Sequence, residues 1–228
     1  MLRLLHDRAG QTDSALLEAA FEMRARTMSD QMGWRFEGQN TSRDTDEFDT
    51  DDTLHFISAD TSGRVVAYGR LNPTMAPHMF SEVFADYCDL DGVLRSPRVY
   101  EHSRYLVDKS FTDKDMWRRH RGAVEVGIAL LCVEAGVRAI TWLSSMAAYT
   151  HVAKITQGTR PLGLPVYSDT DDCDHIAAVS DSVPEAIPFM AAYYGFDGAM
   201  MARLQRQVEA VAPSVAKSIV EFERGIAA

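Results

Sequence analysis

The sequence is poor in the features that mark membrane, secreted and metal-binding proteins. It has three cysteines in 228 residues, Cys88, Cys132 and Cys173, which stand far apart, show no metal-site spacing and fit a reducing compartment. No apolar run reaches the roughly 18 residues that cross a bilayer, because the longest candidate, residues 122–133, contains Glu125. The N-terminus lacks the apolar segment and cleavage site of a secretory signal. We therefore expect a cytoplasmic protein with no membrane span and no metal centre.

Positive charge is also scarce, with 23 lysines and arginines against 33 aspartates and glutamates, and a net charge of −10. General nucleic-acid binding needs a basic surface, so this balance argues against it. One local concentration of basic side chains consists of Lys109, Lys114, Arg118, Arg119 and Arg121. It is either the solvated start of a helix or a docking site for an anionic partner, which would be a phosphorylated cofactor or an acidic carrier protein.

Apolar periodicity and turn residues predict one mixed α/β domain over residues 1–228. Helices are expected over 14–33, 117–136, 145–157, 184–194 and 200–226. Strands are expected over 54–58, 65–71, 99–107, 139–143 and, more weakly, 176–179. The turn residues between the first two strands predict a β-hairpin, and a strand–helix–strand unit follows it. The polar segment 35–52 predicts a loop or a mobile flap.

The strand over 99–107 carries charged side chains within an apolar pattern. Strict alternation puts Glu101, Ser103 and Tyr105 on one face and His102 and Arg104 on the other. Glu101 is either the structural partner of a nearby arginine or a base that deprotonates an amine. If Glu101 and Arg104 share one site, the strand must contain a β-bulge, a feature that is common beside active sites.

Two aspartates and an arginine accompany this strand. Asp46 and Asp49 stand three residues apart in the polar loop, and Arg70 ends an otherwise apolar strand. The aspartates either solvate the loop, bind a cationic substrate group, or hold Arg70, because an arginine in apolar surroundings needs a carboxylate partner. Together with Glu101 and Arg104 they are expected to form one network of three acids and two bases.

Two further segments carry weaker signals. Residues 119–123 are similar to a pyrophosphate-binding turn at the entry to a helix, where backbone N–H groups face phosphate. Residues 171–175 are rich in aspartate and include a histidine, but no second ligand cluster supports a metal site, so a surface acidic loop is the preferred interpretation.

In order and spacing, a set of residues resembles the acyl-homoserine-lactone synthases, the autoinducer synthases of bacterial quorum sensing. The resemblance covers about residues 1–195, and Met28 stands where the family usually has phenylalanine. The residues that carry it are Arg24, Met28, Trp34, Asp46, Asp49, Arg70 within Gly-Arg-Leu-x-Pro-Thr, Phe84, Glu101, Ser103 and Arg104.

This resemblance implies a fold similar to the N-acetyltransferases, with a mixed, splayed sheet between helices in an α-β-α sandwich. It also implies two substrates, S-adenosylmethionine and an acyl thioester on acyl carrier protein or coenzyme A. The methionyl amine attacks the thioester carbonyl, and the methionyl carboxylate then displaces methylthioadenosine to close the lactone. S-adenosylmethionine is consumed as a substrate, so no cofactor is expected.

The resemblance also implies roles for individual residues. Glu101 would deprotonate the amine, directly or through water. Asp46 and Asp49 would hold the ammonium or sulfonium side of the substrate, and the arginines Arg70 and Arg104 would fix carboxylates in the network. The N-terminal helix and flap, about residues 1–52, would cover S-adenosylmethionine. The substrate-binding residues would be Arg24, Met28, Trp34, Phe84, Ser103 and Thr141, where the threonine is compatible with 3-oxo or 3-hydroxy acyl chains. The carrier-docking residues would be Lys114, Arg118, Arg119, Arg121 and Lys154.

Two other functions compete with this one. An acyl-CoA-dependent N-acyltransferase acting on another small amine would share the fold and the residue 119–123 segment, but it gives no reason for Arg24 with Trp34 or for Asp46 with Asp49. An acidic regulatory domain that binds a small molecule would explain an apolar cleft, but it does not explain Glu101 with Arg104.

Overall fold

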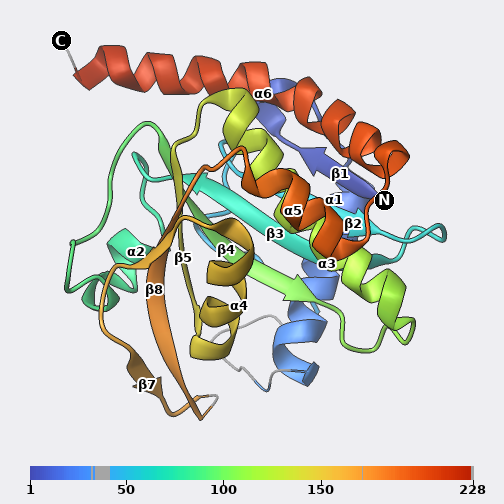
Figure 1. Ribbon diagram of the computed structural model, residues 1–228, viewed down its shortest axis with the longest axis horizontal. Coiled ribbons are helices and arrows are strands. Elements are labelled where there is room, and N and C mark those ends of the chain that lie inside the picture. The colour runs from blue at the N-terminus through green and yellow to red at the C-terminus, as the bar shows by residue number, and fades with distance from the viewer. Residues whose placement is uncertain (32, 34–41, 171, 227–228) are drawn as a thin grey trace.

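The structure is a computed structural model that describes residues 1–31, 33, 42–170 and 172–226. One mixed sheet runs through these residues in the order β1-β2-β3-β4-β5-β8-β6, and β7 pairs with β8 (Figure 1). Its strands are β1 (Leu2–Leu5), β2 (Leu54–Ala59), β3 (Val65–Pro73), β4 (Val99–Val107), β5 (Ala139–Ser145), β6 (Thr159–Pro161), β7 (Val166–Ser168) and β8 (Cys173–Asp181). The predicted mixed sheet flanked by helices is confirmed.

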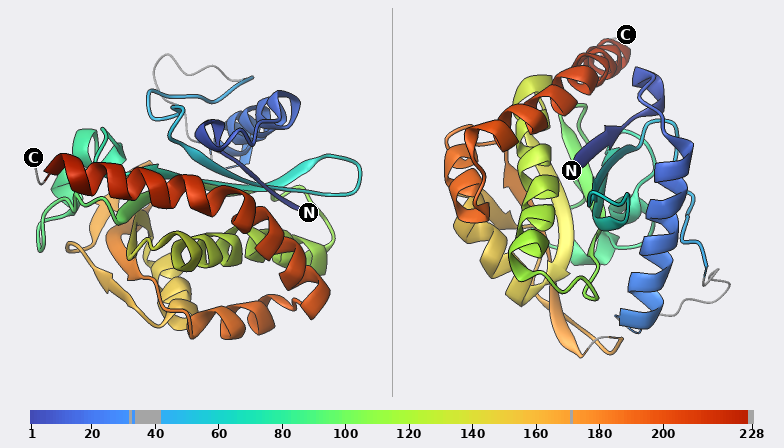
Figure 2. Two further views of the ribbon diagram at one scale, coloured as in Figure 1. Left: turned by 90° about the horizontal axis from the view of Figure 1, so that it is seen from above. Right: turned by 90° about the vertical axis from the view of Figure 1, so that its right-hand side faces the viewer.

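The helices lie on both faces of the sheet. They are α1 (Ser14–Arg26), α2 (Met79–Glu82), α3 (Lys114–Ala135), α4 (Met146–Thr156), α5 (Ala186–Tyr194) and α6 (Gly198–Ile226), with short 3₁₀ turns over Asp7–Ala9 and Ala85–Tyr87 and a π-helical turn over Thr27–Gln31. Figure 2 shows α1 on one face and α3 to α6 on the other. Among the described residues, no helix is long and apolar enough to cross a membrane.

Local sequence explains where several elements begin and turn. Asp13 caps α1 by accepting a hydrogen bond from the backbone N–H of Leu16, so the predicted helix start is confirmed. The hairpin between β2 and β3 is also confirmed. In its turn, the Asp60 carboxylate accepts hydrogen bonds from the backbone N–H groups of Ser62 and Arg64.

The core has a large cluster under α3 and α6 and smaller clusters on the opposite face. Helix α3 buries Val124 and Leu131 against the sheet, and α6 adds Val208 and Val215. The cluster under α1 contains Met23 and Met28, and a third cluster lies beside α2. These apolar contacts supply most of the free energy that orders the sheet.

The sheet opens between β4 and β5. The two strands pair in parallel from Val99 and Ala139 to His102 and Trp142. Beyond that point β4 pairs only with β3, and β5 pairs only with β8. The paired half keeps the sheet continuous, while the open half separates two strand ends, as the expected splayed sheet requires.

A β-bulge lies on β4 next to this opening. Arg70 pairs with Ser103, but Tyr68 pairs with Leu106, so two residues of β4 oppose the single residue Gly69 of β3. The first bulged residue, Arg104, has a φ of 54°, which is rare for a side chain other than glycine. The bulge reverses the alternation of side chains along the rest of β4.

Several sequence expectations are corrected by the structure. Strands β1, β6 and β7 were not expected, because each has only three or four residues and carries no periodicity. Strand β8 is nine residues long, whereas a weak strand over 176–179 was expected. Its first residues are polar, so the apolar pattern shows only its middle part. Residues 119–123 are not a phosphate-binding turn, because they lie inside α3, where the backbone N–H groups are already used by the helix.

Candidate active site

Three aspartates and three arginines form a closed ring of alternating charge on the α1 face of the sheet. Six ion pairs of 2.6 to 3.1 Å join each residue to the two beside it. In order around the ring the residues are Asp44, Arg24, Asp49, Arg70, Asp46 and Arg104. We call this the charge ring. Because the charges alternate, each ion has two opposite charges beside it, and the ring as a whole carries no net charge.

The charge ring joins four parts of the chain. Its arginines come from α1, β3 and β4, and its aspartates all come from the segment that precedes β2. Arg24 and Arg70 have fully buried side chains. The ring therefore fastens residues 44–49 and the end of α1 to the centre of the sheet, in addition to the apolar contacts of the buried Met23 and Phe48.

Local hydrogen bonds fix the positions of Asp46 and Asp49 relative to each other. The backbone N–H of Asp49 bonds the carbonyl of Asp46, and the backbone N–H of Asp46 bonds the carboxylate of Asp49. The two carboxylates thereby face Arg70, which Asp46 binds through both oxygens at 2.6 and 2.9 Å. Burial alone would raise the pKa of Asp49, but Arg70 and Arg24 outweigh it and hold that pKa well below its usual range.

Glu101 lies next to the charge ring but outside it. Its side chain is buried, and Oε2 accepts a 2.8 Å hydrogen bond from the backbone N–H of Phe80 at the start of α2. Oε1 has no hydrogen-bond partner among the residues that the structure describes. Burial raises the pKa of Glu101, and the Phe80 N–H group and the charge of Arg70 oppose that shift only in part. A carboxylate with a raised pKa and one open oxygen is suited to accept a proton.

The bulge on β4 brings Arg104 to the Glu101 face, which is the condition under which the two residues can share a site. Ser103 accepts a 2.9 Å hydrogen bond from Nε of Arg70, and Arg104 joins the charge ring. The expected position of Tyr105 was wrong. Its ring lies 5.3 Å from that of His102, on the α3 face, because the bulge shifts the alternation by one residue.

Two pockets of the structure lie on opposite faces of the sheet. The acidic pocket has a volume of about 350 Å³ and is lined by residues that include Phe21, Arg43, Asp46, Asp49, Asp51 and His55. It borders the charge ring on the α1 face. Burial lowers the pKa of His55 to about 4, so this histidine is neutral at pH 7 and adds no positive charge to the pocket.

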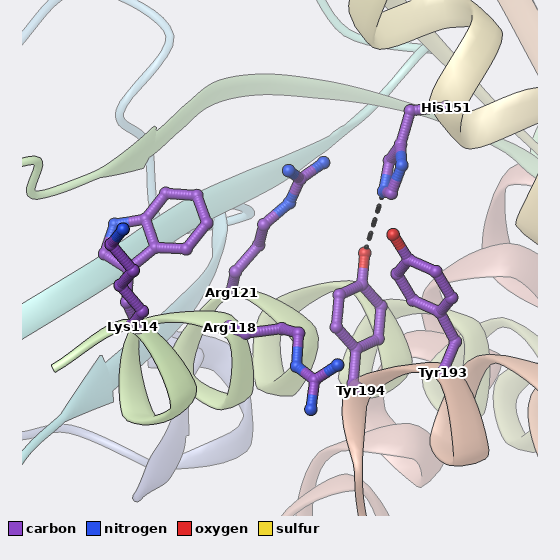
Figure 3. Close-up of a pocket in the computed structure, with 7 residues that line it drawn as sticks. Lys114, Arg118, Arg121, His151, Tyr193 and Tyr194 are labelled. Atoms are coloured by element: carbon purple, nitrogen blue, oxygen red, sulfur yellow. Dashed lines mark hydrogen bonds between the residues drawn. The ribbon is translucent and has the colours of Figure 1, made fainter.

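The basic pocket lies on the other face, with a volume of about 360 Å³ (Figure 3). Its lining is Lys114, Trp117, Arg118 and Arg121 from α3, His151 from α4, and Tyr193 and Tyr194 from α5. Lys154 does not line this pocket and lies one helical turn beyond His151 in α4. Arg119 is on α3, and its buried Nε has no hydrogen-bond partner among the described residues.

Comparisons with known proteins identify the family of this chain. A family model described as autoinducer synthase matches residues 9–157. The chain belongs to the autoinducer synthase family. Isovaleryl-homoserine lactone synthase of Bradyrhizobium diazoefficiens is 27% identical to it over 150 residues, which is 66% of each of the two chains. The match therefore spans just under two thirds of the length of that relative.

Solved structures agree on the fold of this chain. A CoA-dependent acyl-homoserine lactone synthase, BjaI, solved with SAM and isopentyl-CoA, has a TM-score of 0.77 at 22% identity over 87% of this chain and 90% of that one. A protein from Lactobacillus plantarum described as an N-acetyltransferase has a TM-score of 0.51 at 13% identity over 80% and 99% of the two chains. The expected similarity to the N-acetyltransferase fold is confirmed.

The structure brings most of the expected site residues together, but Arg24 and Met28 do not lie where side chains that cover a substrate would be exposed. Arg24 belongs to the charge ring, and Met28 is fully buried in the cluster under α1, so neither side chain is exposed. Thr141 pairs with Glu101 across β4 and β5, and Phe84 packs near Phe80. Trp34 and residues 35–41 of the expected flap lie outside the described residues.

Sequence reasoning missed Asp44 and Glu125. Asp44 closes the charge ring in the place that was expected for Glu101, which lies outside the ring, so the expected network was wrong in its third acid. The network also includes Arg24, which was expected only as a substrate-binding residue. Glu125 gave no such signal, since a single acid within an apolar helix is compatible with many environments.

Proposed function

We propose that this autoinducer synthase makes an N-acyl-L-homoserine lactone from S-adenosylmethionine and an acyl thioester. The observation that carries the proposal is Glu101, a buried carboxylate with a raised pKa and an open oxygen, at the opening between β4 and β5 and beside the charge ring. An amine nucleophile is cationic as supplied and must lose a proton before it attacks, which requires a base in such a place.

S-adenosylmethionine would bind in the acidic pocket. The substrate carries a sulfonium and an ammonium group, and the carboxylates of Asp46, Asp49 and Asp51 line that pocket. Because the charge ring already pairs Asp46 and Asp49 with arginines, they would hold the substrate through their remaining lone pairs rather than as free anions. Arg70 and Arg104 would fix the carboxylates of the charge ring in place, and Trp34 would contribute from the N-terminal cover.

Glu101 would take the proton, either directly or through a water, and the free amine would attack the thioester carbonyl. The thiolate would leave as the amide bond forms. The methionyl carboxylate would then attack the carbon next to the sulfonium and release methylthioadenosine as the lactone closes. Ser103, Phe84 and Thr141 would contact the acyl group near Glu101. S-adenosylmethionine is consumed, so the proposed reaction calls for no separate cofactor.

The acyl donor would approach the basic pocket. Coenzyme A and acyl carrier protein both present the thioester on phosphopantetheine, and a phosphate ester suits a hollow lined by Lys114, Arg118 and Arg121. Arg119 and Lys154 lie near this pocket without lining it, and they would meet an acidic carrier protein at its rim. Among the described residues the three cysteines form no disulfide, which supports action in the reducing cytoplasm.

One incubation tests the proposed function. The purified protein is mixed with S-adenosylmethionine and, in separate arms, with acyl-CoA and acyl carrier protein loaded with chains of several lengths. Methylthioadenosine together with a lactone is the expected result, and mass spectrometry identifies the acyl chain. An acylated amine without methylthioadenosine would favour the N-acyltransferase alternative. Absence of both products with every donor would overturn the proposal.

A further inference from the structure

Glu125 is an acid inside α3 whose carboxylate is almost fully buried, with 10% of its side chain exposed. One oxygen accepts hydrogen bonds from the hydroxyl of Tyr105 at 2.6 Å and from Nε of Arg121 at 3.1 Å. The other oxygen accepts a hydrogen bond from the hydroxyl of Tyr194. A buried carboxylate is costly unless it is bonded in this way, and the steps of the proposed reaction do not use it.

Tyr194 links this carboxylate to another helix. Its ring lies directly on Gly122, where an added Cβ would stand 2.2 Å from Cγ of Tyr194, so only glycine permits this contact. Because the Tyr194 hydroxyl donates to Glu125, its oxygen must accept from Nε2 of His151, 3.2 Å away. The hydrogen-bond chain therefore runs from His151 through Tyr194 to Glu125 and joins α4, α5 and α3.

Arg121, which bonds Glu125 directly, and His151, which reaches it through Tyr194, are both walls of the basic pocket (Figure 3). Arg121 donates a hydrogen bond from Nε to Glu125, and its guanidinium carbon lies 6.0 Å from the centre of the Trp117 ring. Its two Nη groups have no hydrogen-bond partner among the described residues. Lys114 and Arg118, which also line the pocket, form no ion pair with any residue that the structure describes. Asp113 occupies the backbone N–H groups at the start of α3, which leaves anion binding to the side chains.

We propose that Glu125 is a positioning residue for the acyl donor. It holds Arg121 on one wall of the basic pocket and, through Tyr194, His151 on the other, so that the pocket receives the phosphate ester of pantetheine. This inference rests on the proposed function, because it takes coenzyme A or a carrier protein as the donor. Glu125 itself touches no substrate and acts through Arg121 and Tyr194.

The test measures binding as well as turnover. Glu125→Gln keeps the shape of the side chain but loses its charge, so Arg121 is no longer held. We expect the Kd for coenzyme A and for the holo carrier protein to rise about tenfold, the effect of losing one charge-assisted hydrogen bond to phosphate. The Kd for pantetheine, which lacks the phosphate, stays unchanged, as does that for the apo carrier protein, which lacks the whole phosphopantetheine arm. The KM for S-adenosylmethionine also stays close to wild type.

A double variant tests whether Glu125 acts through Arg121. If it does, Glu125→Gln combined with Arg121→Gln binds coenzyme A no more weakly than Arg121→Gln alone. Glu134→Gln is the matched control, because Glu134 is an exposed acid on the same helix that bonds Gln205. Effects that multiply in the double variant would overturn the inference, and so would an equal loss of affinity for pantetheine.

The same measurements separate this inference from the proposed function. A wild-type protein that binds coenzyme A but makes no lactone contradicts the proposed function, while the Glu125→Gln affinities still decide the inference. An effect with the holo carrier protein but not with coenzyme A assigns the phosphate ester to the carrier. No change with either donor overturns the positioning role.

Discussion

The role of Glu101 depends on its being the acid near the site that the arginines do not neutralise. Each aspartate of the charge ring has two arginine partners, whereas Glu101 has a backbone N–H group on one oxygen and an open second oxygen. The same burial that makes an unpaired carboxylate costly raises its pKa and makes it a stronger base. The neighbouring acids therefore differ in function because of their partners, not because of their chemistry.

Replacing Glu101 by glutamine should lower kcat by at least about tenfold, which corresponds to about 1.4 kcal/mol of barrier. Because burial raises the Glu101 pKa, the acid limb of kcat/KM in the wild type should lie above the pH of about 4.3 typical of a free glutamate. Rates measured from pH 4 to 9 check both points. Glu101→Asp should retain part of the activity, and an unchanged rate in Glu101→Gln would remove Glu101 from the role of base.

Asp44 should matter for stability as much as the aspartates that the sequence pattern singled out. Asp44→Asn leaves Arg24 and Arg104 each without one of two counter-charges, and breaking a buried pair on one side costs about 3 kcal/mol. Denaturant unfolding at pH 7 measures this loss. Asp52→Asn is the control, since Asp52 pairs with the exposed Arg8 and should change the free energy of unfolding by less than about 1 kcal/mol. Equal effects of the two changes would contradict a special role for the charge ring.

At the scale of elements, the sequence allows the hairpin, β4, the strand–helix–strand unit and the start of α1 to be predicted, because each has strong periodicity or a clear cap. It also indicates that a bulge is needed in β4, but not that Tyr105 moves to the other face. The short strands β1, β6 and β7 could not be predicted, because their pairing comes from the rest of the sheet and not from their own residues.

The segment that carries the three aspartates should detach from the sheet in acid before the apolar core is affected. The folded-state pKa of Asp49 is below its unfolded value, so its contribution to stability is complete above about pH 4 and is lost as the pH falls further. The difference in unfolding free energy between wild type and Asp49→Asn should therefore be largest near pH 7 and shrink below pH 4. Urea titrations at pH 7, 5, 4 and 3 measure it, and a constant difference would count against this account.

At the scale of the whole molecule, charge is divided between the two faces of the sheet. The acidic pocket and the charge ring lie on the α1 face, and the basic pocket lies on the face of α3 to α6. The opening between β4 and β5 lies between these two faces, with Glu101 beside it. A cationic substrate and an anionic donor could therefore enter from opposite sides and meet at the carboxylate, without either one crossing a region of its own charge.

Because the chain carries a net charge of −10, an acidic carrier protein would be repelled by most of its surface and attracted only near the basic pocket. Salt screens such exposed charges over about 8 Å at physiological ionic strength. We therefore expect the KM for acyl carrier protein to rise with added salt, and to rise much less for the smaller acyl-CoA. The double change Lys114→Gln and Arg118→Gln should raise the KM for the carrier at low salt and flatten its salt dependence. Steady-state rates between 25 and 500 mM NaCl measure both effects, and turnover with carrier protein that is indifferent to salt would show that docking does not rely on this patch.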